Sequence, residues 1–206
     1  AVVDALSRSP QVSKIYCAPG NAGIARQAEC VPVKDTDVEG LLSLAREKEI
    51  DLTVVGPEAA LVAGIVDRFR EEGLRIFGPT KAAARIESSK EFAKDLMGRY
   101  GIPTAGYRAF TDYAAAMDYV ASRPLPAVLK YDGLAAGKGV VIARTMEEAD
   151  AALRDMLLDD KFGKGRVVVE DFLTGPEFSF MCFVSGRKVL PMVLAQDHKR
   201  AFDGDE

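Results

Sequence analysis

A glycine-rich stretch between two apolar runs is the first place in this sequence where chemistry is expected. Residues 130–141 read KYDGLAAGKGVV, with three glycines and two lysines. Backbone N–H groups of such a loop can converge on an anion, and a lysine adds positive charge beside it. The stretch is a candidate phosphate-binding loop, although a flexible hairpin with a solvated lysine would have the same composition.

The loop matches neither common nucleotide-binding motif. A P-loop requires G-x-x-x-x-G-K-[ST] between a strand and a helix. Here Gly133-Leu-Ala-Ala-Gly137-Lys138-Gly139 lacks one spacer residue and no Ser or Thr follows the lysine. GxGxxG is absent as well. Because the following apolar run predicts a strand, we predict a glycine loop between two antiparallel strands, with Lys138 at its tip and Lys130 at the end of the preceding strand, able to reach the same phosphates.

A second candidate region follows an apolar run that ends at Glu170. The residues VVVEDFLTGPEF place Asp171, Phe172 and Leu173 next, and Glu177 after a turn. The exposed backbone of a linker between two lobes can bond to an adenine edge, and a later carboxylate can accept hydrogen bonds from ribose hydroxyls. A strand–turn–strand with two surface acids would have the same pattern.

Alternating strands and helices are predicted to position the first part of the chain. Strands are expected at 14–18, 51–55 and 75–77, and helices at 38–48 and 60–72. This alternation predicts βαβ units and a parallel sheet. Ligands of such sheets lie at the carboxyl ends of the strands, which here read APGNAG, VGPE and FGPT.

The second part of the chain has a different rhythm, typical of a small α+β unit. A helix at 88–100 is expected to begin with a capping box of Ser88 and Glu91 and to end at Gly101. A helix at 145–158 is expected to begin with Thr145 and Glu148 in the same way. The remaining expected elements are strands at 106–110, 127–130, 139–143, 167–172, 177–184 and 188–194, and a helix at 111–123.

Composition excludes several classes of protein. The 206 residues have a net charge of −4, which argues against nucleic acid as the main partner. No apolar run approaches the roughly 20 residues that a membrane span needs, and no signal peptide is visible. The three cysteines show no CxxC spacing, which indicates a reducing compartment and neither a disulfide framework nor a metal site.

The order of these features resembles the ATP-grasp superfamily, in which two α+β subdomains clamp ATP. Several segments narrow the resemblance to the phosphoribosylamine–glycine ligase (glycinamide ribonucleotide synthetase) family, in collinear order over essentially the whole chain. These segments are APGNAG, DLTVVGPEAALVAGIVD, IFGPTKAAARIESSKEFAKDLM, IPTAGY, DGLAAGKGVV and QDHKRAFDGD. One departure is Tyr131, where the family more often has a small residue, and it affects only packing beside the phosphates.

The resemblance implies an α/β fold with four parts. They are a Rossmann-like substrate-binding N-domain at 1–87 without its first strand, a connecting helix at 88–105, an ATP-grasp B subdomain with the glycine lid at 106–173, and the truncated start of the second ATP-grasp subdomain at 174–206. Family members have a GxGGREH-type turn upstream and a GPNTGGMG-like loop downstream. The chain is therefore expected to be a fragment of a longer enzyme, inactive alone.

The implied reaction joins glycine to 5-phosphoribosylamine through a glycyl phosphate, with ATP converted to ADP and phosphate. Such chemistry needs positioning and charge neutralisation, so no protein nucleophile is expected. Mg²⁺ or Mn²⁺ is the expected metal, with its ligands downstream of Glu206. The resemblance further implies a cytoplasmic enzyme of purine biosynthesis, a full-length monomer or weak dimer, and no nucleic-acid or membrane partner.

The resemblance assigns two sets of residues. Those expected to contact ATP are Lys90, Lys130, Gly137, Lys138, Gly139, Glu170, Asp171, Phe172, Leu173 and Glu177. Those expected to contact the other substrates are Gly20, Asn21, Ala22, Gly23, Gly56, Pro57, Glu58, Asp197, His198, Lys199 and Arg200. The lysines would meet phosphates, Glu170 and Leu173 the adenine edge through backbone groups, and Glu177 the ribose.

The substrate set would hold phosphoribosylamine with its phosphate near GNAG, and DHKR would face both substrates. Arg200 and Lys199 suit phosphate and carboxylate groups, and Asp197 suits the glycine ammonium. Each role has a simpler alternative: Lys90 as a solvated helix lysine, His198 as an ordinary polar residue, Glu58 as an acid that starts a helix. For the whole protein, the alternatives are a bicarbonate-using ATP-grasp carboxylase and a non-catalytic nucleotide-binding module.

Overall fold

A computed structural model describes residues 1–133, 135, 139–159 and 161–196. It divides into two compact units, Ala1–Asp171 and Phe172–Glu206, and each is described by itself. The first unit contains two separate hydrophobic cores, one beneath the N-terminal helices and one beneath a four-stranded sheet. In the described residues, no helix has the length and apolar character needed to cross a bilayer.

The N-terminal part of the first unit has short parallel strands, as predicted. Strand β1 (Tyr16–Cys17) pairs with β2 (Glu29–Cys30), and β3 (Thr53–Val54) pairs with β4 (Ile76–Phe77), both in parallel. The sequence did not indicate β2 or the 3-10 turn η1 (Ile24–Arg26). The strands expected at 14–18, 51–55 and 75–77 are confirmed, though each has only two residues.

Helices pack on one another in this part around an apolar core. Helix α1 spans Val2–Ser7 and α2 spans Val38–Glu47, the second close to its predicted range. Leu42 of α2 and Phe69 are almost completely buried in this core. Because each large apolar side chain removed from water contributes about 1.5–3 kcal/mol, this helical layer stabilises the short strands.

The helix predicted at 60–72 is in fact two helices. Helix α3 (Glu58–Ala63) ends at Gly64 and α4 (Ile65–Glu71) begins directly after it. Gly64 has φ +96°, in the left-handed region that glycine adopts at little cost. The apolar pattern continued through Gly64 and concealed the break, so the single-helix prediction was wrong.

The predicted capping box of the central helix was wrong by one residue. Helix α6 spans Lys90–Tyr100, and Ser89, not Ser88, caps it by accepting a hydrogen bond from Phe92 N. Ser88 instead ends α5 (Lys81–Ser88), a helix that was not predicted. The stop at Gly101 is confirmed, with φ +64°.

A four-stranded antiparallel sheet carries the predicted glycine lid. The strands are β5 (Tyr107–Phe110), β6 (Ala127–Tyr131), β7 (Val140–Ala143) and β8 (Val167–Asp171), in the order β5-β8-β6-β7. The lid residues connect β6 to β7, whose register pairs Lys130 with Val140. The antiparallel connection predicted from the missing P-loop features is confirmed.

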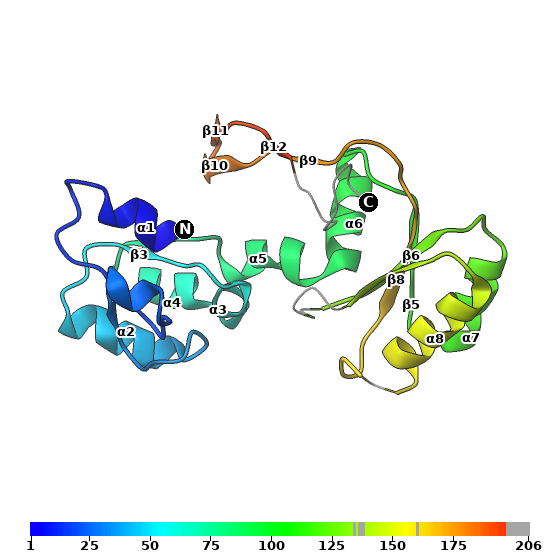
Figure 1. Ribbon diagram of the computed structural model, residues 1–206, viewed down its shortest axis with the longest axis horizontal. Coiled ribbons are helices and arrows are strands. Elements are labelled where there is room, and N and C mark those ends of the chain that lie inside the picture. The colour runs from blue at the N-terminus through cyan, green and yellow to red at the C-terminus, as the bar shows by residue number, and fades with distance from the viewer. Residues whose placement is uncertain (134, 136–138, 160, 197–206) are drawn as a thin grey trace. The chain divides into compact units, whose positions relative to one another are not determined.

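Two helices cover one face of this sheet. Figure 1 shows α7 (Tyr113–Ala121) and α8 (Met146–Leu157) side by side against it. Leu129, Val167 and Val169 point into the core on that face. Because successive strand residues point to opposite faces, Lys130 and Glu170 lie on the other face.

The predicted cap of α8 is confirmed at its first residue. Thr145 Oγ1 accepts a hydrogen bond from Glu148 N at 3.2 Å. The Glu148 carboxylate accepts from Arg144 N at 2.7 Å, one residue before the cap. The capping box is therefore present, but its second hydrogen bond, from a backbone N–H to the glutamate, comes from Arg144 and not from the cap residue Thr145.

The second unit consists of two antiparallel pairs. Strand β9 (Phe178–Ser179) pairs with β12 (Ala195–Gln196), and β10 (Cys182–Ser185) pairs with β11 (Lys188–Pro191). The strand expected at 177–184 is interrupted, and β12 was not predicted as a separate strand. All described residues of this unit, 172–196, are exposed, including large apolar side chains such as Phe180 and Leu190.

Candidate functional site

The base of the glycine loop is attached to the start of helix α6. The Asp132 carboxylate, directly after β6, accepts hydrogen bonds from the backbone N–H groups of Lys90 and Glu91 and from the Ser89 hydroxyl. A negative charge at a helix N-terminus also interacts favourably with the helix dipole. Asp132 therefore fixes the position of Lys90 relative to the loop, a role that sequence reasoning missed.

Lys90 points to the first residues of the loop. Its Nζ donates a hydrogen bond to the carbonyl oxygen of Gly133 at 3.0 Å. Two residues separated by 43 positions are thus in direct contact at the base of the predicted lid. In this structure, Lys90 is not a solvated helix lysine, which was the simpler alternative for it.

Lys130 and Glu170 meet on the sheet face opposite the core. Lys130 Nζ lies 2.9 Å from Glu170 Oε2, and the Glu170 side chain is only 6% exposed. The neighbouring strands β6 and β8 bring them together, since their register pairs Val128 with Glu170. The structure therefore joins the lysine expected at the phosphates and the glutamate expected at the adenine through one ion pair.

A third charged residue, Lys94 of α6, joins this pair and was not predicted. Its Nζ lies 3.1 Å from the same Glu170 oxygen, and its side chain is 8% exposed. It also donates to Thr104 Oγ1 at 2.8 Å and to the Ala105 carbonyl at 3.1 Å. The available signal was its spacing: Lys94 is four residues after Lys90, so both lie on the same side of the helix.

Asp171, at the end of β8, is bound at both its side chain and its backbone. Its carboxylate accepts a hydrogen bond from Arg123, and its N–H donates to the Gly106 carbonyl at 2.9 Å. This carboxylate raises the pKa of the Arg123 guanidinium. Phe172, Leu173 and Glu177 belong to the second unit, where Phe172 and Leu173 are exposed.

The residues expected at the phosphoribosylamine follow two separate strands. Asn21 Oδ1 accepts from the backbone N–H groups of Gly23 and Ile24, both at 3.0 Å, and closes the turn after β1. Gly20 has φ +77°, and a Cβ there would lie 2.4 Å from Cys30 Sγ, so only glycine fits. The backbone of this turn is ordered by its own side chain, and Ala22 at its tip is exposed.

Gly56 and Pro57 lie between β3 and helix α3, and Glu58 begins that helix. Pro57 is the N-cap residue and Glu58 the first helical residue. This position suits a ligand at the end of β3, and it equally suits an acid that complements the helix dipole. The position of Glu58 is thus compatible with both roles considered for it.

Six predicted site residues lie outside the described residues. They are Gly137, Lys138, Asp197, His198, Lys199 and Arg200. Gly139 is described: it is buried, and a Cβ there would lie 2.6 Å from Ala135 Cβ and 3.2 Å from Tyr131 Cβ. A side chain at Gly139 would therefore collide with the base of the loop.

Tyr131 lies on the core side of the sheet. Its hydroxyl donates to the Gly163 carbonyl at 3.2 Å, and its ring lies 5.3 Å from that of Phe162. Lys130, the preceding residue, points to the opposite face because side chains alternate along a strand. The departure of Tyr131 from the family pattern therefore alters the packing of the core behind the loop, on the face away from Lys130.

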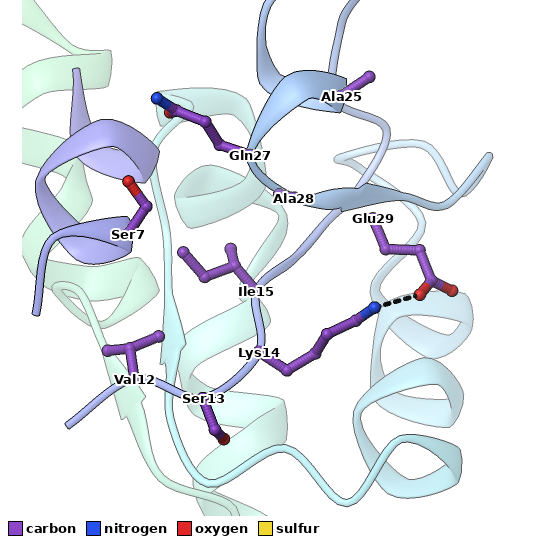
Figure 2. A pocket seen from close by; sticks show the side chains of 9 residues that line it. All are labelled: Ser7, Val12, Ser13, Lys14, Ile15, Ala25, Gln27, Ala28 and Glu29. Atoms are coloured by element: carbon purple, nitrogen blue, oxygen red, sulfur yellow. Dashed lines mark ion pairs between the residues drawn. The ribbon is translucent and has the colours of Figure 1, made fainter. Parts of the chain in front are cut away.

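A hollow elsewhere in the first unit contains no predicted site residue. The hollow has a volume of about 450 Å³ and is lined by residues next to β1 and β2. Figure 2 shows the ion pair between Lys14 and Glu29 on its wall. Both side chains are about half exposed, so water screens the pair. In the described ranges, no three His, Cys, Asp or Glu side chains gather in a way that could hold a metal ion.

Comparison with known families gives a match over the whole chain. The profile described as "Phosphoribosylglycinamide synthetase, N domain" matches residues 1–87. The profile described as "Phosphoribosylglycinamide synthetase, ATP-grasp (A) domain" matches residues 88–206.

Named relatives agree with these profiles. Phosphoribosylamine–glycine ligase of Halalkalibacterium halodurans is 56% identical over 202 residues, which cover 97% of this chain and 47% of the relative. The corresponding Listeria innocua protein is 51% identical over 209 residues, covering 100% of this chain and 50% of the relative. The chain therefore spans about half the length of the curated relatives that it matches.

Solved structures confirm the expected ATP-grasp fold. The crystal structure of phosphoribosylamine–glycine ligase from Thermotoga maritima has a TM-score of 0.78 and 30% identity, covering 99% of this chain and 49% of that one. An N5-carboxyaminoimidazole synthetase from Staphylococcus aureus, complexed with ADP, has a TM-score of 0.73 at 15% identity, covering 96% and 52%. The second likeness supports the fold alone, and the matches do not favour either alternative considered from the sequence.

Proposed function

Because this chain belongs to the phosphoribosylglycinamide synthetase family, we propose that the protein it represents joins glycine to 5-phosphoribosylamine at the expense of ATP. The products are glycinamide ribonucleotide, ADP and phosphate. The observation that carries this proposal within the structure is the gathering of Lys90, Lys130 and the base of the glycine loop. Two cations from distant segments beside a glycine loop suit a polyphosphate.

The reaction has two steps. A carboxylate oxygen of glycine attacks the γ-phosphorus of ATP, and the bond from that phosphorus to the β–γ bridging oxygen breaks, which gives glycyl phosphate and ADP. The amine of phosphoribosylamine then attacks the acyl carbon, loses a proton and expels phosphate. Neither step needs a protein nucleophile, since positioning and neutralisation of the phosphate charge supply most of the catalysis.

Lys90 and Lys130 hold the phosphates, and Gly137, Lys138 and Gly139 form a lid above them that excludes water while it is closed. Backbone groups at Glu170, Asp171, Phe172 and Leu173 meet the adenine edge, and Glu177 the ribose. The match of residues 88–206 to a family described as an ATP-grasp domain supports a nucleotide here. The ATP comes with Mg²⁺ or Mn²⁺, although no cluster in the described residues suits that ion.

The other substrates have their own residues in the proposal. The turn of Gly20, Asn21, Ala22 and Gly23 receives the phosphate of phosphoribosylamine, and Gly56, Pro57 and Glu58 bind the rest of it. Asp197, His198, Lys199 and Arg200 face glycine and phosphoribosylamine. Support for the two strand-end groups is that ligands of parallel sheets bind at such ends.

The same proposal covers organisation and cellular setting. Residues 1–87 form the substrate-binding N-domain, 88–105 the connecting helix, 106–173 the ATP-grasp B subdomain and 174–206 the start of the second subdomain. The enzyme works in the cytoplasm as a monomer or weak dimer, on small molecules, without nucleic acid or membrane. The 206 residues alone bind nucleotide weakly and do not turn over.

The test is ADP release by the full-length protein with ATP, glycine and phosphoribosylamine. We expect ADP release that requires both glycine and phosphoribosylamine. The Lys130→Ala variant should lose at least about two orders of magnitude in kcat/KM, because it lacks a contact to the phosphates. Lys164→Ala is the matched control, since Lys164 is an exposed lysine of the same subdomain. ADP release that depends on bicarbonate and not on glycine would refute the proposal.

A further inference from the structure

Two lysines share one oxygen of a buried glutamate. Glu170 Oε2 lies 3.1 Å from Lys94 Nζ and 2.9 Å from Lys130 Nζ. The Glu170 side chain is 6% exposed and that of Lys94 is 8% exposed, whereas Lys130 is 29% exposed. The cluster therefore has two buried members and one that reaches solvent.

The two lysines are held very differently. A lysine ammonium has three N–H donors, and Lys94 has three acceptors in place: Glu170, Thr104 Oγ1 and the Ala105 carbonyl. All three N–H donors of Lys94 therefore have a protein acceptor, without any ligand. In the described residues, Lys130 has Glu170 as its acceptor, which leaves donors for another partner. Of the two cations, Lys130 is the one that can move.

Movement of Lys130 would change the charge balance around Glu170. If Lys130 turned to a phosphate oxygen, Glu170 would lose one of its two counter-ions inside the protein. A buried carboxylate without a paired cation is strongly unfavourable. Lys94 removes this obstacle, because it stays in contact with Glu170 whichever partner Lys130 has.

We propose that Lys94 is a positioning residue for ATP binding: it is the permanent counter-ion of Glu170, which lets Lys130 transfer from Glu170 to a nucleotide phosphate. The inference rests on the proposed function, because it needs a phosphate beside Lys130. It adds a residue of α6 that touches neither nucleotide nor substrate. Lys94 acts only through the charge of Glu170.

The test is nucleotide affinity of the full-length protein, measured by calorimetry with ATP in the absence of glycine. Lys94→Met removes the ammonium but keeps an unbranched side chain of similar length. It is expected to raise the Kd for ATP about tenfold, because Glu170 then retains Lys130. Arg99→Met, an exposed cation on the same helix, is the control and should leave the Kd unchanged.

A second substitution separates charge balance from packing. In an Glu170→Gln background the carboxylate is absent, so Lys94→Met should change the Kd by less than about threefold. If Lys94 only filled space, the loss would be equally large in both backgrounds, and this result would overturn the inference. A Kd unchanged by Lys94→Met alone would overturn it as well.

Folding is an informative outcome too. If Lys94→Met fails to fold but Lys94→Met/Glu170→Gln folds and binds ATP like Glu170→Gln, the charge role is supported. If both variants fail to fold, Lys94 is needed for packing and the inference is wrong. Absence of ATP binding by the unsubstituted protein would instead refute the proposed function, and the two failures are thereby distinguished.

Discussion

Asp132 connects the glycine loop to the start of helix α6, and its replacement by alanine is expected to loosen this connection and to lower the stability of the fold. The substitution removes the acceptor of three hydrogen bonds, from Lys90 N, Glu91 N and the Ser89 hydroxyl. It also removes a negative charge from the helix N-terminus. Ser89 still caps the helix through Phe92 N, so the helix itself should persist.

The magnitude follows from these contacts. Loss of a capping side chain costs about 0.5–2 kcal/mol, and loss of the charge near the helix dipole about 0.3–1 kcal/mol. Since Ser89 retains part of the cap, we expect the free energy of unfolding to fall by about 1–2 kcal/mol. Asp132→Asn, which keeps an acceptor but not the charge, should cost only about 0.3–1 kcal/mol.

The assay is urea unfolding of the 206-residue chain, followed by tyrosine fluorescence. The chain has no tryptophan, and all six tyrosines lie in residues 1–171, so the signal reports the first unit alone. The matched control is Asp118→Ala, because Asp118 is an exposed residue of α7. An Asp132→Ala midpoint equal to that of the control would refute the proposed connection between loop and helix.

The same contact should affect nucleotide binding. Asp132 holds the Lys90 backbone while the Lys90 side chain donates to Gly133. In the full-length protein, Asp132→Ala should therefore weaken ATP binding without removing either lysine. Hydrogen exchange at the Lys90 and Glu91 amides should become faster in the variant and remain unchanged in Asp118→Ala.

Three other substitutions test the assignments of single residues. Gly98→Ala should raise the free energy of unfolding by about 0.5–1 kcal/mol, because Gly98 is an exposed helical residue and an added Cβ meets nothing within 4 Å. Gly101→Ala should lower it by about 1 kcal/mol, because Gly101 ends the helix at φ +64°. In urea unfolding, a lower stability of Gly98→Ala would contradict the first assignment, and a higher stability of Gly101→Ala the second. The hydrogen bond to Asp95 raises the pKa of Tyr107 to about 12, from about 10 when unfolded. The stabilisation that this hydrogen bond gives the folded state should be complete below pH 10 and lost as the pH approaches 12. A pH titration of tyrosinate absorbance, compared between the unsubstituted chain and Tyr107→Phe, identifies Tyr107 as the group that titrates.

Local patterns predicted the element types well, and their limits have identifiable causes. Alternating apolar runs located the sheet strands, and Gly101 located the end of α6. The prediction of a single helix at 60–72 was wrong because Gly64 breaks the helix without breaking the apolar pattern. The cap at Ser88 failed because the S-x-x-E motif fits only Ser88 with Glu91, whereas the helix begins one residue later and Ser89 accepts the hydrogen bond from Phe92 N.

Among the residues of the proposed site, those on the glycine loop have a local sequence pattern, and those that depend on long-range pairing do not. The glycine loop and Lys130 have a clear local signature. The spacing of Lys94 from Lys90 puts both on one side of the helix, but two lysines four residues apart are equally typical of a solvated helix face. The burial of Lys94 depends on Glu170, which is 76 positions later and reaches it only once β8 has joined the sheet.

The direction of the Lys130 side chain follows one geometric rule that the sequence does contain. Lys130 and Tyr131 are neighbours on β6, and alternation places the tyrosine in the core and the lysine on the opposite face. The core behind the loop is filled by Tyr131, whose hydroxyl reaches Gly163. A shift of one residue in the β6–β8 register would exchange the two side chains, burying the ammonium and exposing the ring. The packing of Tyr131 therefore fixes the direction of Lys130, so the core of this sheet contributes to the proposed phosphate site without lining it.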